Sequence, residues 1–152
     1  MELIMLCGIP TAGKSTFSKN PKYKNYVRIS SDDILDQIAK QKQTTYNAIF
    51  QKNIGFAQKL MMKQLRKAVE ERRNIIWDQT NITPKQRIDK LKMIPGDYYK
   101  IAVWFMIPMK DALTRNMKRE GKIIPPEVIQ RMYDEFEIPT LYEGFNEIIK
   151  GN

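Results

Sequence analysis

The chain has 152 residues, a formal net charge of +9 and a hydrophobic fraction of 42%, which is ordinary for a folded domain with its own core. It has no histidine and one cysteine, Cys7, which excludes histidine-based acid–base chemistry, serine triads, most zinc sites and an internal disulfide. No apolar run approaches the roughly 20 residues that span a bilayer, and Met1 leads directly into an apolar run. We therefore expect no signal peptide, no membrane partner and a cytoplasmic protein, or an intracellular one if it is viral.

The first predicted element is a buried strand at residues 2–7, which leads into a glycine-rich loop. The loop reads Gly8-Ile9-Pro10-Thr11-Ala12-Gly13-Lys14-Ser15-Thr16 and fits G-x-x-x-x-G-K-[ST] at every fixed position, with a helix expected over 14–19. Gly8 and Gly13 let the backbone bend so that successive N–H groups face phosphate oxygens. Lys14 would reach the β- and γ-phosphates, and the Ser15 hydroxyl would ligate Mg²⁺. This strand–loop–helix predicts a site for ATP and Mg²⁺.

A second strand, at 26–29, runs into Ser30-Ser31-Asp32-Asp33 and then a helix. One residue of this group is expected to cap that helix, because Ser and Asp accept hydrogen bonds from free N–H groups. Without histidine, any general base must be a carboxylate. We expect one of the two aspartates to accept the proton of an attacking hydroxyl.

The longest predicted helix covers about 45–73, and its apolar positions recur every three or four residues from Tyr46 to Val69. We interpret this helix as structural. The third strand, 74–78, ends at Asp78, as expected of a Walker B carboxylate that orients Mg²⁺. Asp78 opens the run Asp78-Gln79-Thr80-Asn81, and Pro84 starts another helix after Thr83 as its N-cap.

A fourth strand is predicted at 99–107 and ends at Pro108, and a weaker fifth strand lies at 147–149. Between them, a basic run at helical spacing, Arg115, Lys118, Arg119 and Lys122, has the form of a helical lid with a hinge at Gly121. A late helix follows Pro125-Pro126. The alternation predicts an α/β P-loop kinase fold over 1–152: one domain, a parallel sheet of about five strands, helices on both faces and a helical lid.

These motifs together resemble the kinase domain of the 5′-hydroxyl polynucleotide kinases, the phage and animal end-healing enzymes. The resemblance runs over nearly the whole chain. It is carried by Gly8-Ile9-Pro10, Asp32-Asp33, Asp78 to Asn81, Arg115-Asn116, Lys118-Arg119, Ile124-Pro125, Val128 and residues 137–145.

The resemblance implies that Asp32 is the general base, that Lys14 and Ser15 contact the donor phosphate and the metal, and that Arg119 is the essential lid arginine. Arg115 matches a second lid arginine, so residues 8–16 with Arg115 and Arg119 form the expected ATP site. The expected metal contacts are Ser15 and Asp78, and the expected acceptor contacts are Asp32, Asp33, Asn81 and Arg87.

Two positions depart from the family. Ser30-Ser31 stands where the family usually has Asn-Arg, and Leu35 stands where the phage enzyme has an arginine that contacts the acceptor's phosphate. The chain has no D-x-D-x-T phosphatase motif and no room for a ligase, so any such partner must be a separate chain.

Three functions follow from these patterns. The first is transfer of the ATP γ-phosphate to the 5′-hydroxyl end of DNA or RNA, in keeping with a basic chain that attracts polyanions. The second is phosphorylation of a nucleoside, a sugar or a similar alcohol, which needs the same donor site. The third is a non-catalytic nucleic-acid-binding module, which would not need Asp32 and Arg119.

Overall fold

The structure, a computed structural model, describes residues 1–152 and confirms the predicted alternation of strands and helices. The strands are β1 (Glu2–Cys7), β2 (Val27–Ile29), β3 (Ile75–Asp78), β4 (Tyr99–Trp104) and β5 (Glu147–Lys150). The helices are α1 (Lys14–Ser18), α2 (Ser31–Gln41), α3 (Tyr46–Glu70), α4 (Pro84–Leu91), α5 (Met109–Met117) and α6 (Pro126–Glu135). Two short 3-10 turns, η1 (Pro21–Tyr23) and η2 (Leu141–Glu143), complete the chain.

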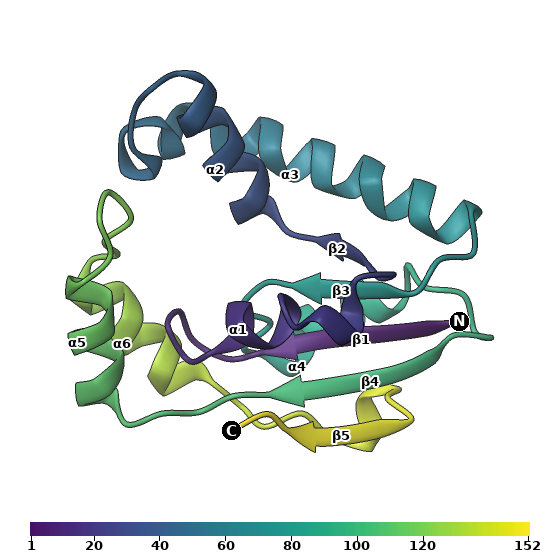
Figure 1. The fold of residues 1–152 in the computed structure, drawn as a ribbon. Coiled ribbons are helices and arrows are strands. Elements are labelled where there is room, and N and C mark those ends of the chain that lie inside the picture. The colour runs from purple at the N-terminus through teal and green to yellow at the C-terminus, as the bar shows by residue number, and fades with distance from the viewer.

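The five strands form one parallel sheet in the order β2-β3-β1-β4-β5. All of them therefore point their carboxyl ends to the same edge, where α5 and α6 stand (Figure 1). Because β1 lies in the middle of the sheet, the loop that follows it opens at the centre of this edge. In open α/β sheets this edge is where ligands bind.

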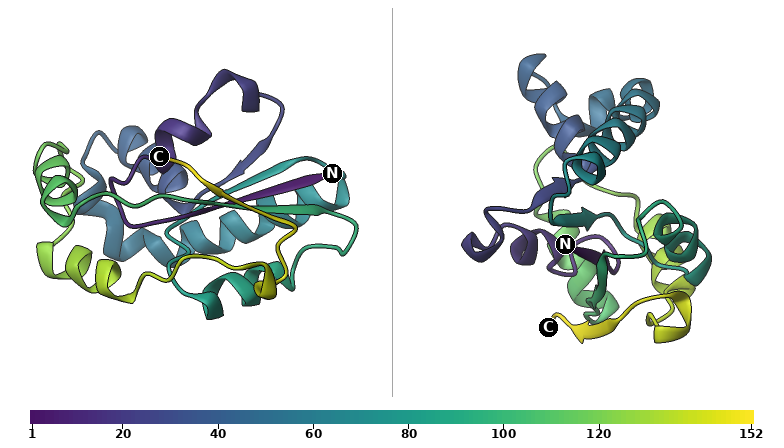
Figure 2. Two further views of the ribbon diagram at one scale, coloured as in Figure 1. Left: turned by 90° about the horizontal axis from the view of Figure 1, so that it is seen from below. Right: turned by 90° about the vertical axis from the view of Figure 1, so that its right-hand side faces the viewer.

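Each face of the sheet has its own hydrophobic core. Successive residues of β1 alternate between them, so Leu3 and Met5 pack with α2, α3 and α4, whereas Ile4 and Leu6 pack with the phosphate loop, α5 and α6. The views in Figure 2 show α3 and α4 on one side of the sheet and α1 on the other. None of the helices is both long and apolar enough to cross a membrane.

The expected strand at 99–107 is shorter in the structure, because β4 ends at Trp104. Its ladder with β1 runs from Glu2 opposite Tyr99 to Cys7 opposite Trp104. After Cys7 the chain turns into the glycine-rich loop, and β4 loses its partner. Apolar residues beyond that point, such as Phe105 and Ile107, are buried against the loop and α5 instead.

Candidate active site

The loop after β1 is held in place by close backbone contacts. Gly8 N–H donates to Thr80 O at 2.8 Å, and a Cβ at Gly8 would lie 2.6 Å from the Phe105 carbonyl oxygen. Gly8 and Gly13 also have positive φ angles, 153° and 112°. Ser15 and Thr16 are exposed at the start of α1. The sequence-predicted loop therefore exists with the conformation that its glycines require.

Lys14 is 8% exposed, and its Nζ donates to the carbonyl oxygens of Gly8 and Ile9, each at 2.7 Å. Burial lowers the pKa of Lys14 to about 8, while the carboxylates of Asp78 and Asp32 act in the opposite direction. The charge of Arg119 lowers it further. Asp78, Asp32 and Arg119, which are expected to act on metal, acceptor and phosphate, thus lie close enough to Lys14 to influence its pKa.

Asp78 belongs to an ionic network that the sequence did not reveal. Its Oδ2 accepts hydrogen bonds from Ser18 Oγ at 2.9 Å and from Arg28 Nε at 3.1 Å. Arg28 also reaches Asp33, with 3.0 Å between Nη2 and Oδ1. Burial raises the pKa of Asp33, and Arg28 offsets part of that effect. The only sign of this network in the sequence was Arg28 itself, a charged residue between Val27 and Ile29 in a short strand.

Asp32 differs from its neighbour because it is exposed and faces the lid. Ser30 caps α2 by accepting the Asp33 N–H, so neither aspartate is used as the cap. The Tyr46 hydroxyl donates to Asp32 Oδ1 at 2.8 Å, and Lys122 Nζ lies 3.6 Å from Oδ2. Burial and then the Asp32 charge raise the pKa of Tyr46, so this hydroxyl remains a donor. The sequence pattern placed Tyr46 among the periodic apolar positions of a structural helix and gave no sign of this contact.

The Lys122 ammonium contacts three groups near the lid: two carboxylates and an aromatic ring. It pairs with Asp36 at 2.9 Å as well as with Asp32, and its Nζ lies 4.3 Å from the centre of the Tyr46 ring. A cation over an aromatic face is held by the ring quadrupole in addition to the carboxylates. The arrangement fixes the Asp32 carboxylate from the α3 side and from the lid side.

The residues between α5 and α6, 118–125, form the lid loop. Two asparagines hold consecutive residues of this loop from opposite sides. The buried Asn116 exchanges two hydrogen bonds with the backbone of Ile124, at 2.7 and 3.0 Å. Asn47, near the start of α3, exchanges two with the backbone of Ile123, at 2.9 and 2.8 Å. Asn47 N–H also donates to Gly121 O at 2.9 Å, so the loop bridges α5 and α3.

The lid arginines occupy separate positions. Arg115 lies on α5, and its Nη1 donates to Thr11 O in the phosphate loop at 3.1 Å. Arg119 lies in the lid loop, where its charge acts on both Lys14 and Tyr46. The expectation that Lys118, Arg119 and Lys122 continue one helical face with Arg115 is wrong, because α5 ends at Met117. Gly121, with φ of 63°, packs so closely on Thr45 that a Cβ would lie 2.8 Å from it.

Asn81 and Arg87 are both fully buried, with 0% exposure. Asn81 Nδ2 donates to Leu6 O at 2.7 Å, and its Oδ1 accepts from Lys90. Arg87 forms a two-point pair with Glu143, at 2.6 and 2.9 Å, and also donates to the carbonyls of Asn81 and Glu137. Every buried polar atom of these side chains has a partner within the chain, and neither side chain has exposed surface. The structure therefore does not support the expectation that Asn81 and Arg87 contact an acceptor.

Leu35 and Cys7 are core residues. Leu35 lies on the buried side of α2 with 0% exposure, so an apolar core side chain stands where the phage enzyme has an arginine. Cys7 is also fully buried, and burial raises the pKa of its thiol to about 12. A thiol with such a pKa is protonated at neutral pH and is not a nucleophile.

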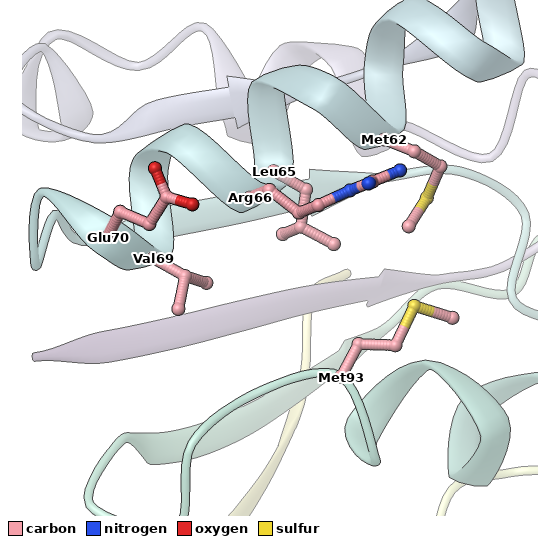
Figure 3. A pocket seen from close by; sticks show the side chains of 6 residues that line it. All are labelled: Met62, Leu65, Arg66, Val69, Glu70 and Met93. Atoms are coloured by element: carbon pink, nitrogen blue, oxygen red, sulfur yellow. The ribbon is translucent and has the colours of Figure 1, made fainter.

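A hollow of about 460 Å³ lies elsewhere, between the second half of α3 and the segment after α4 (Figure 3). It is lined by Met62, Leu65, Arg66, Val69, Glu70 and Met93. Glu70 ends α3 shortly before β3 begins, so the hollow belongs to the amino end of the sheet. It contains none of the residues expected to act on ATP or on an acceptor.

The parallel sheet, the phosphate loop at its centre and the lysine within it define a P-loop kinase. The family model AAA_33, described as an AAA domain, matches residues 3–139, and the chain belongs to this family.

Two curated relatives are similar over most of the chain. The L-seryl-tRNA(Sec) kinase of Methanococcus maripaludis is 30% identical over 139 residues, 90% of this chain and 53% of the relative. A "putative bifunctional polynucleotide kinase/RNA ligase" of Autographa californica nuclear polyhedrosis virus is 27% identical over 146 residues, 89% of this chain and 21% of the relative. The chain thus spans about half the length of the first relative and about a fifth of the second.

A solved structure of a "putative kinase" from Chloroflexus aurantiacus has the same fold. Its TM-score is 0.73 at 14% identity, and the match covers 98% of this chain and 83% of that one. At this identity the likeness concerns the fold alone.

Proposed function

We propose that this P-loop kinase transfers the γ-phosphate of ATP to a hydroxyl carried by a nucleic acid, with the 5′-hydroxyl end of DNA or RNA as the acceptor. The observation that carries the proposal is the environment of Asp32. It is an exposed carboxylate at the carboxyl edge of the sheet, and its negative charge acts to raise the pKa of Lys14. Asp33, by contrast, is paired with Arg28.

In the proposed reaction, Asp32 accepts the proton of the acceptor hydroxyl as that oxygen attacks the γ-phosphorus. The new P–O bond forms while the bond from the γ-phosphorus to the bridging β-phosphate oxygen breaks, and ADP leaves. Lys14, Arg115 and Arg119 lie on the phosphate loop, α5 and the lid loop, where they would offset the charge of the transferring group. Tyr46 and Lys122 orient the Asp32 carboxylate.

The residues present fit Mg²⁺ bound together with ATP. No group of three or more His, Cys, Asp or Glu side chains is arranged to hold a metal alone. Mg²⁺ typically takes one or two protein oxygens, phosphate oxygens and water. The exposed Ser15 hydroxyl would be a direct ligand, and Asp78, already bonded to Ser18 and Arg28, would act through water. Bound there, the ion would neutralise charge on the phosphates.

The names of the two relatives support an acceptor that belongs to a nucleic acid. The viral relative is named as a polynucleotide kinase, which favours a 5′-hydroxyl end. The archaeal relative is named as an L-seryl-tRNA kinase, which favours a second candidate acceptor, the seryl hydroxyl of a charged tRNA. Both acceptors place a primary hydroxyl on a nucleic acid, and both would use Asp32 in the same way.

The experiment offers γ-labelled ATP with Mg²⁺ to four acceptors: a 5′-hydroxyl RNA, a 5′-hydroxyl DNA, a seryl-tRNA and a free nucleoside. We expect label on the 5′ end of the oligonucleotides. Label on the seryl group would select the second candidate. Efficient labelling of the nucleoside, with none on the polynucleotides, would contradict the proposal and favour a small-molecule kinase.

A further inference from the structure

Helix α3 carries a basic face along its exposed side. Between Tyr46 and Val69 the helix has no acidic residue, and Glu70 is its last position. Its exposed cations and one exposed aromatic ring are spaced three or four residues apart, which places them on one side of the helix. We call these residues the α3 basic stripe: Lys52, Phe56, Lys59, Lys63, Arg66 and Lys67.

The cations of the stripe have almost no partners within the chain. Lys67 lies 3.7 Å from Glu71, whereas no ion pair or side-chain hydrogen bond involves Lys52, Lys59, Lys63 or Arg66. Like charges four residues apart, such as Lys59 and Lys63, are destabilising in a helix. The stability of α3 therefore does not explain the stripe.

Two uncharged residues, Phe56 of the stripe and its neighbour Gly55, also lack a structural explanation. Phe56 is 59% exposed, although an apolar ring of this size is normally buried. The preceding Gly55 is destabilising inside a helix, and a Cβ there would meet no atom within 4 Å. Packing thus does not require a glycine. Because Gly55 has no side chain, a planar group stacked on the exposed Phe56 ring can approach the helix backbone closely.

Cations in a row with an exposed aromatic ring match the chemistry of single-stranded nucleic acid. Phosphates along the backbone face the cations, and an unpaired base stacks on the ring. Lys52 and Lys67 are about 22 Å apart along the axis, enough for several nucleotides. At the C-terminal end of the stripe, a polar hollow of about 680 Å³ is lined by Lys63, Arg66, Lys67, Glu70 and Glu71. The negative charges of Glu70 and Glu71 mark the end of the basic surface on that side.

We propose that the α3 basic stripe binds a single-stranded segment of the nucleic acid whose hydroxyl is phosphorylated. The same helix serves both sites: Tyr46, which contacts Asp32, lies six residues before Lys52, and α3 then runs away from the lid corner to the far end of the sheet (Figure 1). This inference rests on the proposed function for the identity of the acceptor. Binding itself can be measured without catalysis.

The first test measures the affinity of a fluorescent single-stranded 20-nucleotide RNA by anisotropy, without ATP, over a range of salt concentrations. The stripe variant is Lys59→Glu with Lys63→Glu. The matched control, Lys24→Glu with Lys85→Glu, changes the net charge equally at exposed positions outside α3. We expect the stripe variant to lose at least tenfold in affinity at low salt and to flatten the salt slope by about 1.4, since each contact contributes about 0.7.

The second variant is Phe56→Ala, which we expect to weaken binding about tenfold, with rescue by Phe56→Trp. In the kinase assay, the loss of kcat/KM in the Lys59→Glu/Lys63→Glu variant should be several-fold larger for the 20-mer than for a 5′-hydroxyl trinucleotide. Equal losses in the stripe and control variants, or an unchanged affinity in Phe56→Ala, would overturn the inference. The inference would also be overturned if the unaltered protein were a dimer that dissociates in the stripe variant, because the stripe would then be an interface between two copies of this chain. RNA binding that depends on the stripe, without any 5′ phosphorylation, would refute the proposed function alone.

Discussion

At the scale of single residues, Asp32 and Asp33 are adjacent in sequence but have different environments. Asp33 is paired with Arg28, which also holds Asp78, so it belongs to the ionic network beneath the phosphate loop. Asp32 lies outside this network and contacts Tyr46 and the lid. A proton acceptor must be within reach of the acceptor hydroxyl, and we propose that the exposed Asp32, rather than Asp33, fills this role.

Substitutions of the two aspartates should therefore have different effects on kcat. Asp32→Asn keeps the size of the side chain and an acceptor for the Tyr46 hydroxyl but removes the base, so kcat should fall by roughly 10²- to 10⁴-fold while ATP affinity persists. Asp33→Asn should have a milder effect. Steady-state kinetics and ATP binding on both variants check this, and the opposite ranking would transfer the base role to Asp33.

Lys14 predicts a pH dependence of nucleotide binding. Burial gives its ammonium a pKa of about 8, and phosphate oxygens would raise that pKa in the complex. Below pH 8 the group is charged in both states, so affinity is constant. As pH rises above 8, binding must take up a proton, and affinity should fall by up to about tenfold per pH unit.

Titration calorimetry at pH 7 and 9, in two buffers of different ionisation enthalpy, measures this proton uptake. Lys14→Arg is the control, because arginine stays charged throughout this range. Affinity that does not change with pH, with no proton uptake at pH 9, would contradict the assigned role of Lys14.

At the scale of elements, the lid loop is tied to α3 as well as to α5. Asn47 holds Ile123 and Gly121 on one side, and Asn116 holds Ile124 on the other. In the chain Arg119 lies between Asn116 and Gly121, so its position depends on both attachments. Lys122 lies in the same loop and contacts Asp32, so we propose that a closure of the lid over ATP would also orient the Asp32 carboxylate.

Asn47→Ala should release the loop from α3. We expect faster proteolysis near Gly121 in the free protein and a lower kcat, with a smaller effect on ATP affinity. Gln51→Ala, at an exposed position on the same helix, is the control. Arg119→Lys should also lower kcat, because lysine cannot hold two phosphate oxygens as a guanidinium can. Unchanged cleavage and turnover in both variants would make the loop an ordinary surface connection.

At the scale of the whole molecule, Arg87 connects α4 to the C-terminal part of the chain. Its side chain has 0% exposure, that of Glu143 has 5%, and the pair is joined at two points. Removing one partner of a buried pair leaves the other charge uncompensated. Arg87→Gln should therefore reduce the free energy of unfolding by about 3–5 kcal/mol.

Urea unfolding measures this loss. Lys85→Gln, on the same helix but in an exposed pair with Asp89, should leave the midpoint of urea unfolding almost unchanged, because solvent screens such a pair. If Arg87→Gln were as stable as the unaltered protein but bound acceptor poorly, Arg87 would be an acceptor residue after all.

The sequence was sufficient for features that depend on local chemistry and periodicity. The phosphate loop, the five strands and the long helix α3 follow from glycine spacing and apolar patterns, and the structure confirms them. It was insufficient where partners are distant in the chain. Arg28 reaches Asp78 and Tyr46 reaches Asp32 only through the tertiary fold. For the same reason, the buried Arg87 could not be distinguished from a ligand-binding arginine by its type alone.

The proposed kinase activity is tested most directly with two RNAs of the same sequence, one with a 5′-hydroxyl and one with a 5′-phosphate, as acceptors of labelled γ-phosphate. We expect the unaltered protein to label the 5′-hydroxyl RNA, phosphatase to remove this label, and the 5′-phosphate RNA to stay unlabelled. Asp32→Asn should label neither RNA at a comparable rate. Equal labelling of both RNAs, or full activity of Asp32→Asn on the 5′-hydroxyl RNA, would refute 5′-hydroxyl transfer with Asp32 as the base.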